Sequence, residues 1–234
     1  LGTIQHTAYD LEAGTVGLKP GINNAAVDHF RIRVHGKSTH VSTPHLGVDA
    51  LYIASQIVVA VQGLVTRRTS PTEPVIIGIG KLNAGTTYNA VAAFAEMEGT
   101  TRTISQESRD RVRAQVSETA QSIAALYGGT AEVEWTDFAA ALINDPQVCR
   151  EAAEVVDELL GEGHVVTDRE LSLSGDNFAE FELYKPGAYA YLGTGNPDLP
   201  HTMITNHNGG FDVDENALVT GAGLYVGYTV ARLG

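Results

Sequence analysis

The sequence predicts two kinds of structural unit in one chain, an α+β unit followed by an α/β unit. Three observations support this prediction. Residues 27–136 show strand and helix patterns in the order βαββαβ, a buried strand and a helix follow in the last third, and too few strands lie there to cover its helices. We therefore expect the second unit to be part of a larger sheet domain.

The βαββαβ unit is predicted from the spacing of its apolar residues. Residues 27–34 alternate apolar side chains with arginines, which gives the period of two of a half-buried strand. Residues 47–66 repeat apolar side chains every three or four positions and should form an amphipathic helix. Two more strands are expected over 75–79 and 90–103, separated by a turn at Gly85.

The second helix and the last strand complete this unit. Ser105 can cap a helix that the pair Gly128-Gly129 ends, and residues 132–135 supply the last strand. This order is the split-βαβ pattern of ferredoxin-like domains, in which two helices cover one face of an antiparallel sheet. We expect this domain over residues 25–138.

The flanking residues, 1–24 and 139–234, are expected to form parts of the α/β domain. Two short strands are predicted before residue 24, separated by a turn-rich segment over residues 10–14. A helix should begin at Asp145-Pro146, residues 188–193 should form a buried strand, and Asp214 can cap the last helix. The first residues already resemble the interior of a strand, so we expect that an upstream segment has been removed.

Composition restricts the classes of partner. The 234 residues are 43% hydrophobic and 18% charged, which is typical of a globular protein with a substantial core. The net charge of −13 makes nucleic acid an unexpected partner, and no apolar run approaches the roughly 20 residues of a membrane span. Cys149 is the single cysteine and forms no internal disulfide, which favours a reducing compartment such as the cytoplasm.

A loop over residues 36–47 carries two histidines, His40 and His45, among Gly, Ser, Thr and Pro. Such a polar turn can present an imidazole rather than bury it, so the loop supports a functional hypothesis. The alternative is a loop before a helix with two solvated histidines. From the loop alone the two interpretations are equally good.

Four other residues are candidates for chemistry. His6 and His207 lie where an imidazole could bind a metal, although each alone is more often an ordinary loop histidine and no local metal motif is present. Asn89 and Arg102 are, on spacing alone, a turn asparagine and a solvent-facing arginine. Functionally, the arginine could hold a carboxylate and the asparagine could donate to a carbonyl oxygen.

Considered together, these segments resemble the dinuclear-metal aminoacylase and carboxypeptidase family, in particular its hippurate hydrolase and N-acyl-amino-acid amidohydrolase branch. The resemblance spans essentially the whole chain. The residues that carry it are Ala26-Val27-Asp28-His29-Phe30, Gly36-Lys37-Ser38-Thr39-His40, Pro44-His45, Gly47-Val48-Asp49-Ala50, Asn89, Glu98-Gly99-Thr100-Thr101-Arg102, His207 and Phe211-Asp212-Val213-Asp214-Glu215.

The resemblance implies a ferredoxin-like lid and dimerisation domain inserted in a catalytic α/β metallohydrolase domain. It implies that His40 polarises the scissile carbonyl, often from the partner subunit, that Asn89 and Arg102 grip the substrate, and that His6 and His207 are metal ligands. The implied cofactors are two divalent ions (Zn, Mn, Co or Ni). The implied substrate is an N-acyl amino acid or dipeptide-like molecule, and the implied assembly is a homodimer formed through the lid.

The chain departs from the family pattern in several places. No adjacent Glu pair occurs, so the general base and the remaining ligands are expected upstream, and this chain alone should be inactive. Residues 176–178 are Asp-Asn-Phe where relatives usually have Glu-Asp-Phe, and Asn89 is followed by Ala-Val-Ala instead of x-Ile-Pro. The competing hypothesis is a non-catalytic dimerisation or binding module that retains the lid fold. Within the histidine loop, His40 is the expected catalytic donor and His45 is expected to be structural.

Overall fold

The computed structural model describes residues 2–234, which form two compact units. The first, here named the βαββαβ unit, contains residues 25–141 and 173–175. The second, here named the flanking unit, contains the chain up to Asn24 together with residues 142–172 and 176–234. Each unit has its own hydrophobic core.

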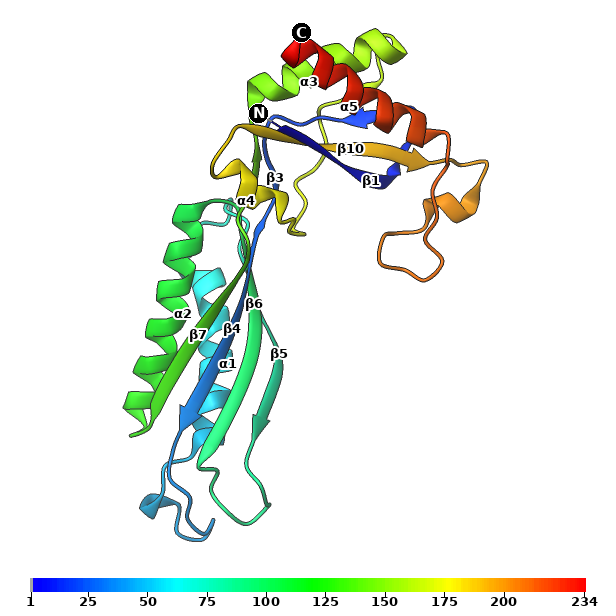
Figure 1. Cartoon of the computed structure of the whole chain (residues 1–234). Coiled ribbons are helices and arrows are strands. Elements are labelled where there is room, and N and C mark those ends of the chain that lie inside the picture. The colour runs from blue at the N-terminus through cyan, green and yellow to red at the C-terminus, as the bar shows by residue number, and fades with distance from the viewer. Residues whose placement is uncertain (1) are drawn as a thin grey trace. The chain divides into compact units, whose positions relative to one another are not determined.

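The βαββαβ unit is one antiparallel sheet covered on one face by two helices (Figure 1). Its strands lie in the order β5-β6-β4-β7. The elements in chain order are β4 (Ala26–His35), α1 (Ala50–Arg67), β5 (Ile76–Ala84), β6 (Phe94–Thr103), α2 (Gln106–Leu126) and β7 (Thr130–Ala139). The predicted ferredoxin-like fold class is confirmed.

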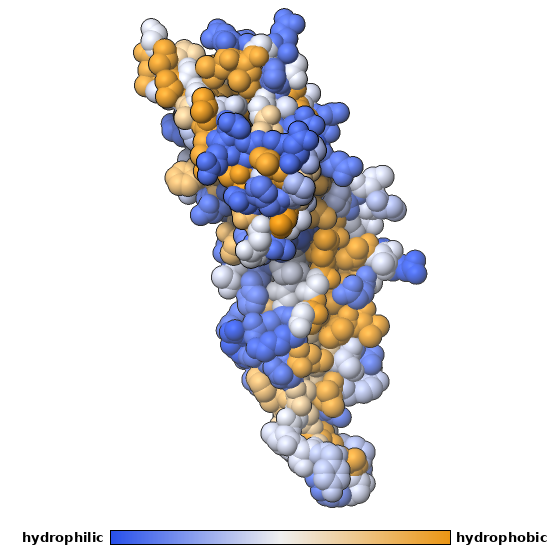
Figure 2. Space-filling model, turned by 90° about the vertical axis from the view of Figure 1, so that its right-hand side faces the viewer, coloured by the Kyte–Doolittle hydropathy of each residue, from blue (hydrophilic) through white to orange (hydrophobic). Residues whose placement is uncertain are grey.

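The core of this unit lies between the sheet and the helices. Phe30, Ile32 and Val34 alternate along β4 and are fully buried against the helices, where Ile57 of α1 and Val116 of α2 are also buried. The other face of the sheet is charged. Figure 2 shows hydrophilic side chains gathered on one side of this unit and apolar side chains on the other.

Two capping residues set where the helices begin. Asp49 accepts hydrogen bonds from the N–H groups of Leu51 and Tyr52 at the start of α1. The predicted Ser105 cap is present, because its hydroxyl accepts a bond from the Ser108 N–H at 3.1 Å. By length and composition α1 could cross a membrane, but in this fold one face of it belongs to the core.

The flanking unit contains a four-stranded sheet with two helices, α3 (Pro146–Leu160) and α5 (Ala217–Leu233), packed against each other (Figure 1). The sheet has the order β1-β10-β2-β9, and its two long strands, β1 and β10, are parallel. The strands are β1 (Gly2–Glu12), β2 (Val16–Gly17), β9 (Val165–Val166) and β10 (Gly187–Gly195). A pair formed by β3 (Gly21–Asn24) and β8 (Leu142–Asn144) and a short helix, α4 (Phe178–Glu182), complete the unit.

Two local expectations for this unit need correction. The predicted turn after Tyr9 does not interrupt the first strand, because β1 runs on to Glu12, which pairs with Gly195. The last helix is not capped by Asp214 itself. Asn216 occupies the N-cap position, and the Asp214 carboxylate accepts a bond from the Asn216 N–H at 2.9 Å.

Candidate active site

His40 and Asn89 belong to two loops at the same end of the βαββαβ unit (Figure 1). An isolated antiparallel bridge joins His40 to Ala90, and the Val41 N–H donates to the Asn89 carbonyl at 3.1 Å. The Val91 N–H donates to the Thr39 carbonyl at 2.8 Å. Two candidate residues that lie 49 positions apart in the sequence are therefore held in one short ladder.

A second pair of backbone bonds closes the base of the histidine loop. Lys37 and Val48 exchange N–H···O bonds of 2.8 and 2.9 Å. Glycines stand beside this bridge for a steric reason: a Cβ on Gly47 would lie 2.7 Å from the Lys37 carbonyl, and one on Gly36 would collide with the Val48 carbonyl. The loop between the two glycines is thus tied at both ends.

The imidazole of His40 is exposed and oriented by its own turn. The Ser42 backbone N–H donates to His40 Nδ1 at 3.2 Å, and the Ser42 hydroxyl lies 2.7 Å from the same nitrogen. These contacts occupy Nδ1, and on this exposed side chain Nε2 makes no hydrogen bond among the described residues. His45 lies in the short 3₁₀ turn Pro44–Leu46 of the same loop.

The amide of Asn89 is oriented in a similar way. The Thr87 hydroxyl donates to Asn89 Oδ1 at 3.2 Å, which leaves the Nδ2 group as the outward donor. The side chain is exposed. Asn89 can therefore offer an N–H to a carbonyl oxygen, as the resemblance implies.

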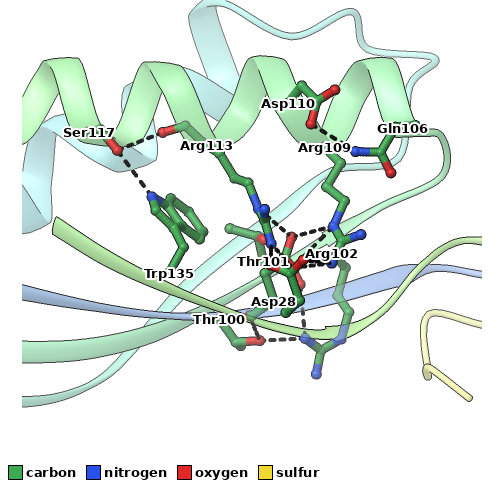
Figure 3. A network of polar contacts seen from close by, with 11 residues as sticks. Asp28, Thr100, Thr101, Arg102, Gln106, Arg109, Asp110, Arg113, Ser117 and Trp135 are labelled. Atoms are coloured by element: carbon green, nitrogen blue, oxygen red, sulfur yellow. Dashed lines mark hydrogen bonds and ion pairs between the residues drawn. The ribbon is translucent and has the colours of Figure 1, made fainter. Parts of the chain in front are cut away.

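Arg102 lies on the charged face of the sheet, on the side away from α2 (Figure 3). Its Nη1 donates to the Thr100 hydroxyl and, at 2.9 Å, to the Thr101 carbonyl. The Thr100 hydroxyl in turn donates to the Asp28 carbonyl at 2.7 Å, which fixes it as an acceptor for the arginine. Burial lowers the pKa of Arg102 and the charge of Asp28 opposes this shift, but an arginine stays protonated at neutral pH.

Other arginines neutralise the buried carboxylate of Asp28 from the opposite face (Figure 3). Asp28 is 1% exposed and accepts hydrogen bonds from Arg109 and Arg113 of α2. Burial raises the pKa of Asp28, but the bonds from Arg109 and Arg113 outweigh it and the net shift is downward. No ion pair joins Asp28 to Arg102 among the described residues, so the remaining donors of Arg102 are left for another acceptor.

The sheet separates Arg102 from the pair formed by His40 and Asn89. Arg102 lies eight residues after Phe94, the first residue of β6, which corresponds to about 26 Å along the strand. The bridge of His40 to Ala90 lies beyond the Phe94 end of that strand. In one copy of the unit, His40 and Asn89 therefore lie at one end of the sheet and Arg102 lies near the other.

His6 and His207 both belong to the flanking unit. His6 Nδ1 donates to the Thr7 carbonyl at 2.8 Å, and the ring stacks on Tyr189 with centroids 5.9 Å apart. His207 is exposed and has a φ of 62°, in the left-handed region. Its neighbour Asn206 places Nδ2 3.4 Å from the Thr7 carbonyl, which brings the His207 loop against β1 near His6.

Comparisons with known proteins agree with the fold described above. A family profile described as a peptidase dimerisation domain matches residues 25–127. The chain is 33% identical to N-acetyl-L-cysteine deacetylase of Bacillus subtilis, over 92% of this chain and 49% of that protein. It is 32% identical to thermostable carboxypeptidase 1 of Saccharolobus solfataricus, over 93% of this chain and 54% of that protein.

A solved structure extends the similarity to both units. A dinuclear metal-binding peptidase of the M20 family from Bacillus subtilis matches 99% of this chain and 56% of its own, with a TM-score of 0.78 and 29% identity. Residues 25–127 thus carry a peptidase dimerisation domain, and the chain as a whole is similar to enzymes of the dinuclear-metal aminoacylase and carboxypeptidase family. Its homologues are hydrolases, and it spans about half the length of the curated relatives that it matches.

Divalent metals are the cofactors associated with this family, and His6 fits such a group. Because Nδ1 is engaged by a backbone carbonyl, the lone pair of Nε2 is available, which is the usual arrangement of a metal-binding histidine. Within residues 2–234, however, no cluster of three or more His, Cys, Asp and Glu side chains is present. His6 and His207 would therefore need further ligands to hold a metal ion.

Asp176, which departs from the family pattern, contacts the aromatic residues behind His6. Its Oδ1 accepts a bond from the Phe178 N–H at 2.8 Å, and its Oδ2 accepts the Tyr189 hydroxyl at 3.1 Å. Tyr189 is the ring on which His6 stacks. The shorter aspartate thus supports the aromatic wall of the candidate metal site.

Sequence reasoning missed the residues that orient the candidate side chains in this chain. Ser42, Thr87 and Thr100 are short polar residues two positions from His40, Asn89 and Arg102, a spacing that signals a local side-chain bond. The buried role of Asp28 could have been predicted, because a charged residue at an inward-facing position of a strand needs a buried partner.

Proposed function

We propose that this chain is the dimerisation domain and C-terminal catalytic half of a metal-dependent amidohydrolase. The substrates are N-acyl amino acids or similar small molecules that carry a carboxylate. The observation that carries the proposal is the pairing of His40 with Asn89, because each presents a donor directed away from its loop. The deacetylase and carboxypeptidase relatives support the same reaction class.

Each residue has a distinct role in this proposal. His40 Nε2–H donates to the carbonyl oxygen of the scissile amide and stabilises the negative charge that develops there. Asn89 Nδ2 donates to a neighbouring carbonyl oxygen of the substrate. Arg102 binds the substrate carboxylate with the donors that Thr100 and Thr101 leave unused.

His6 and His207 would hold divalent ions, of which Zn, Mn, Co and Ni are the candidates. When bound, such ions lower the pKa of water and polarise the carbonyl. His6 is oriented for this role by the Thr7 carbonyl and by the ring of Tyr189. We propose that the remaining ligands and the general base come from a segment that this chain does not contain, and that the chain alone is inactive.

A homodimer completes the site in this proposal. The match to a peptidase dimerisation domain supports self-association through the βαββαβ unit. The distance of about 26 Å along β6 between Phe94 and Arg102 supports a site to which one copy contributes His40 and Asn89 and the other contributes Arg102. We extend the proposal to a cytoplasmic location, which the single unpaired Cys149 supports.

The decisive experiment uses the longest natural gene product that contains this chain. Purified with its metals, it should hydrolyse N-acetylated amino acids, and His40→Ala should lower kcat by about 100-fold or more without loss of folding. His45→Ala is the matched control and should retain near-normal kcat. Near-normal turnover of His40→Ala would contradict the catalytic role. A natural product that begins at Leu1 and binds no metal would favour the non-catalytic dimerisation module.

A further inference from the structure

The turn that follows His40 binds the histidine through both its backbone and its side chain. The Thr43 N–H donates to the His40 carbonyl at 2.9 Å, which closes a four-residue turn. Inside that turn, Ser42 directs its backbone N–H and its hydroxyl to His40 Nδ1, at 3.2 and 2.7 Å. Of the two ring nitrogens of His40, Nδ1 is thus the one that contacts the protein.

The backbone contact shows which nitrogen carries the proton in this structure. A backbone N–H can only donate, so the nitrogen that receives it must present a lone pair. In a neutral imidazole, one nitrogen is a donor and the other an acceptor. Nδ1 is therefore the acceptor, the Ser42 hydroxyl donates to it, and the proton of the neutral ring lies on Nε2.

We propose that Ser42 is a positioning residue that holds His40 in the Nε2–H tautomer. The inference rests on the proposed function, because it specifies how the donor to the scissile carbonyl is prepared. Only the Nε2–H tautomer gives a neutral His40 a donor on the nitrogen that faces solvent. Without the Ser42 hydroxyl, Nδ1 would keep only the longer contact from the backbone N–H at 3.2 Å. The other tautomer would then gain population, and that part of the population would turn a lone pair toward the carbonyl oxygen, where it repels.

The same logic explains why Ser42, and not another polar residue of the loop, takes this role. Thr39 precedes His40 and Thr43 lies three residues after it, but their hydroxyls contact each other at 3.3 Å. The Thr43 hydroxyl also contacts the His40 carbonyl at 3.3 Å. Among the described contacts, the hydroxyl of Ser42 is the one that reaches the ring.

The test uses this chain itself, labelled with 15N at histidine, so that the tautomer is observed without any activity. Near pH 8.5, where an imidazole is neutral, the 15N shifts of His40 should show a protonated Nε2 and an unprotonated Nδ1. His40→Gln identifies the signals of this residue. Ser42→Ala removes the hydroxyl and keeps the backbone N–H, so it should move both shifts part of the way toward the average of the two tautomers, and Ser42→Thr, which keeps the hydroxyl, should restore them.

Ser38→Ala is the matched control, since it removes a hydroxyl from the same loop without touching the ring, and it should leave the shifts unchanged. A protonated Nδ1 in the unmodified chain, or shifts that Ser42→Ala leaves unchanged, would overturn the inference. In the assembled enzyme, Ser42→Ala should lower kcat by about 10-fold with little change in KM, because only transition-state donation is lost.

These outcomes separate the inference from the proposed function. If His40→Ala leaves turnover intact while Ser42 still controls the tautomer, the catalytic role of His40 fails and the assignment of the tautomer stands. If His40→Ala abolishes turnover while Ser42→Ala changes neither the shifts nor kcat, the positioning role fails and the proposed function stands.

Discussion

Arg109 of α2 binds the buried carboxylate of Asp28 on β4 through hydrogen bonds of 3.1, 3.0 and 2.6 Å. Both side chains are almost fully buried, at 6% and 1% exposure. The pair joins the second helix to β4, one of the two inner strands of the βαββαβ unit. It lies on the face opposite Arg102, so the charge of Asp28 is satisfied without involving the candidate substrate ligand (Figure 3).

The first prediction concerns the stability of this pair. Asp28→Ala should destabilise the βαββαβ unit by about 3–5 kcal/mol, because it leaves a buried guanidinium without its counter-charge. Urea unfolding monitored by circular dichroism measures the effect. The control is Asp137→Ala, since Asp137 also pairs with Arg113 but is 68% exposed, and it should cost less than about 1 kcal/mol. Equal costs for the two variants would contradict this account.

The second prediction concerns acid stability. The pKa of Asp28 is lower in the folded chain than its usual value near 3.8, so the folded state favours the ionised form. The stabilisation is present above the unfolded pKa and is lost as the pH falls through the folded pKa, which places the loss below about pH 4. Melting temperatures measured from pH 7 to pH 3 should fall more steeply for the unmodified chain than for Asp28→Asn.

The third prediction concerns Glu182 in the flanking unit. Burial raises the pKa of Glu182 to about 7, although the hydrogen bond that its carboxylate accepts from the Ile143 N–H at 2.9 Å acts to lower it. Its Oε1 atom is buried and has no hydrogen-bond partner among the described residues. A raised carboxyl pKa means that stability is fully present below the unfolded pKa and is lost as the pH rises through about 7.

Glu182→Gln should therefore flatten the decline in stability between about pH 5 and pH 8. Urea midpoints at the two pH values measure it. Glu162→Gln, at an exposed position in the same unit, should leave the decline as it is. If the stability of Glu182→Gln falls with pH as steeply as that of the unmodified chain, another group causes the decline.

The fourth prediction concerns the sharing of residues between subunits. In the full-length enzyme, homodimers of His40→Ala and of Arg102→Ala should each be inactive. When the two variants are unfolded and refolded together, mixed dimers should contain one intact site, and about a quarter of the normal activity should return. No recovery, with mixed dimers demonstrated by mass spectrometry, would place all three residues of a site in one subunit.

The regular elements were predictable because their patterns are local. Alternation along β4 and the spacing of three and four along α1 follow directly from burial on one face. The continuation of β1 to Glu12 was missed, because the chain there looks turn-like and pairing with Gly195, a contact 183 residues away, decides it. Asp214 was predicted to cap the last helix because aspartate is a common capping residue, but the residue type alone does not show that the N-cap is Asn216.

The candidate site was predictable only in outline. The identities of His40, Asn89, Arg102, His6 and His207 came from resemblance to a family, and their roles remain predictions. The ladder between His40 and Ala90 and the separation of Arg102 from it are properties of the sheet, which residue spacing does not encode. The roles of Ser42 and Thr87 depend on side-chain directions that only the folded loops reveal.

The bridge between Lys37 and Val48 has a consequence for the energetics of binding. A loop tied at its base and along the segment at His40 has already lost its conformational entropy when the chain folds. Substrate then meets a preorganised donor, and little of its binding energy is consumed in ordering the loop. A side chain at Gly36 would break that closure and weaken transition-state stabilisation although it touches no reacting atom.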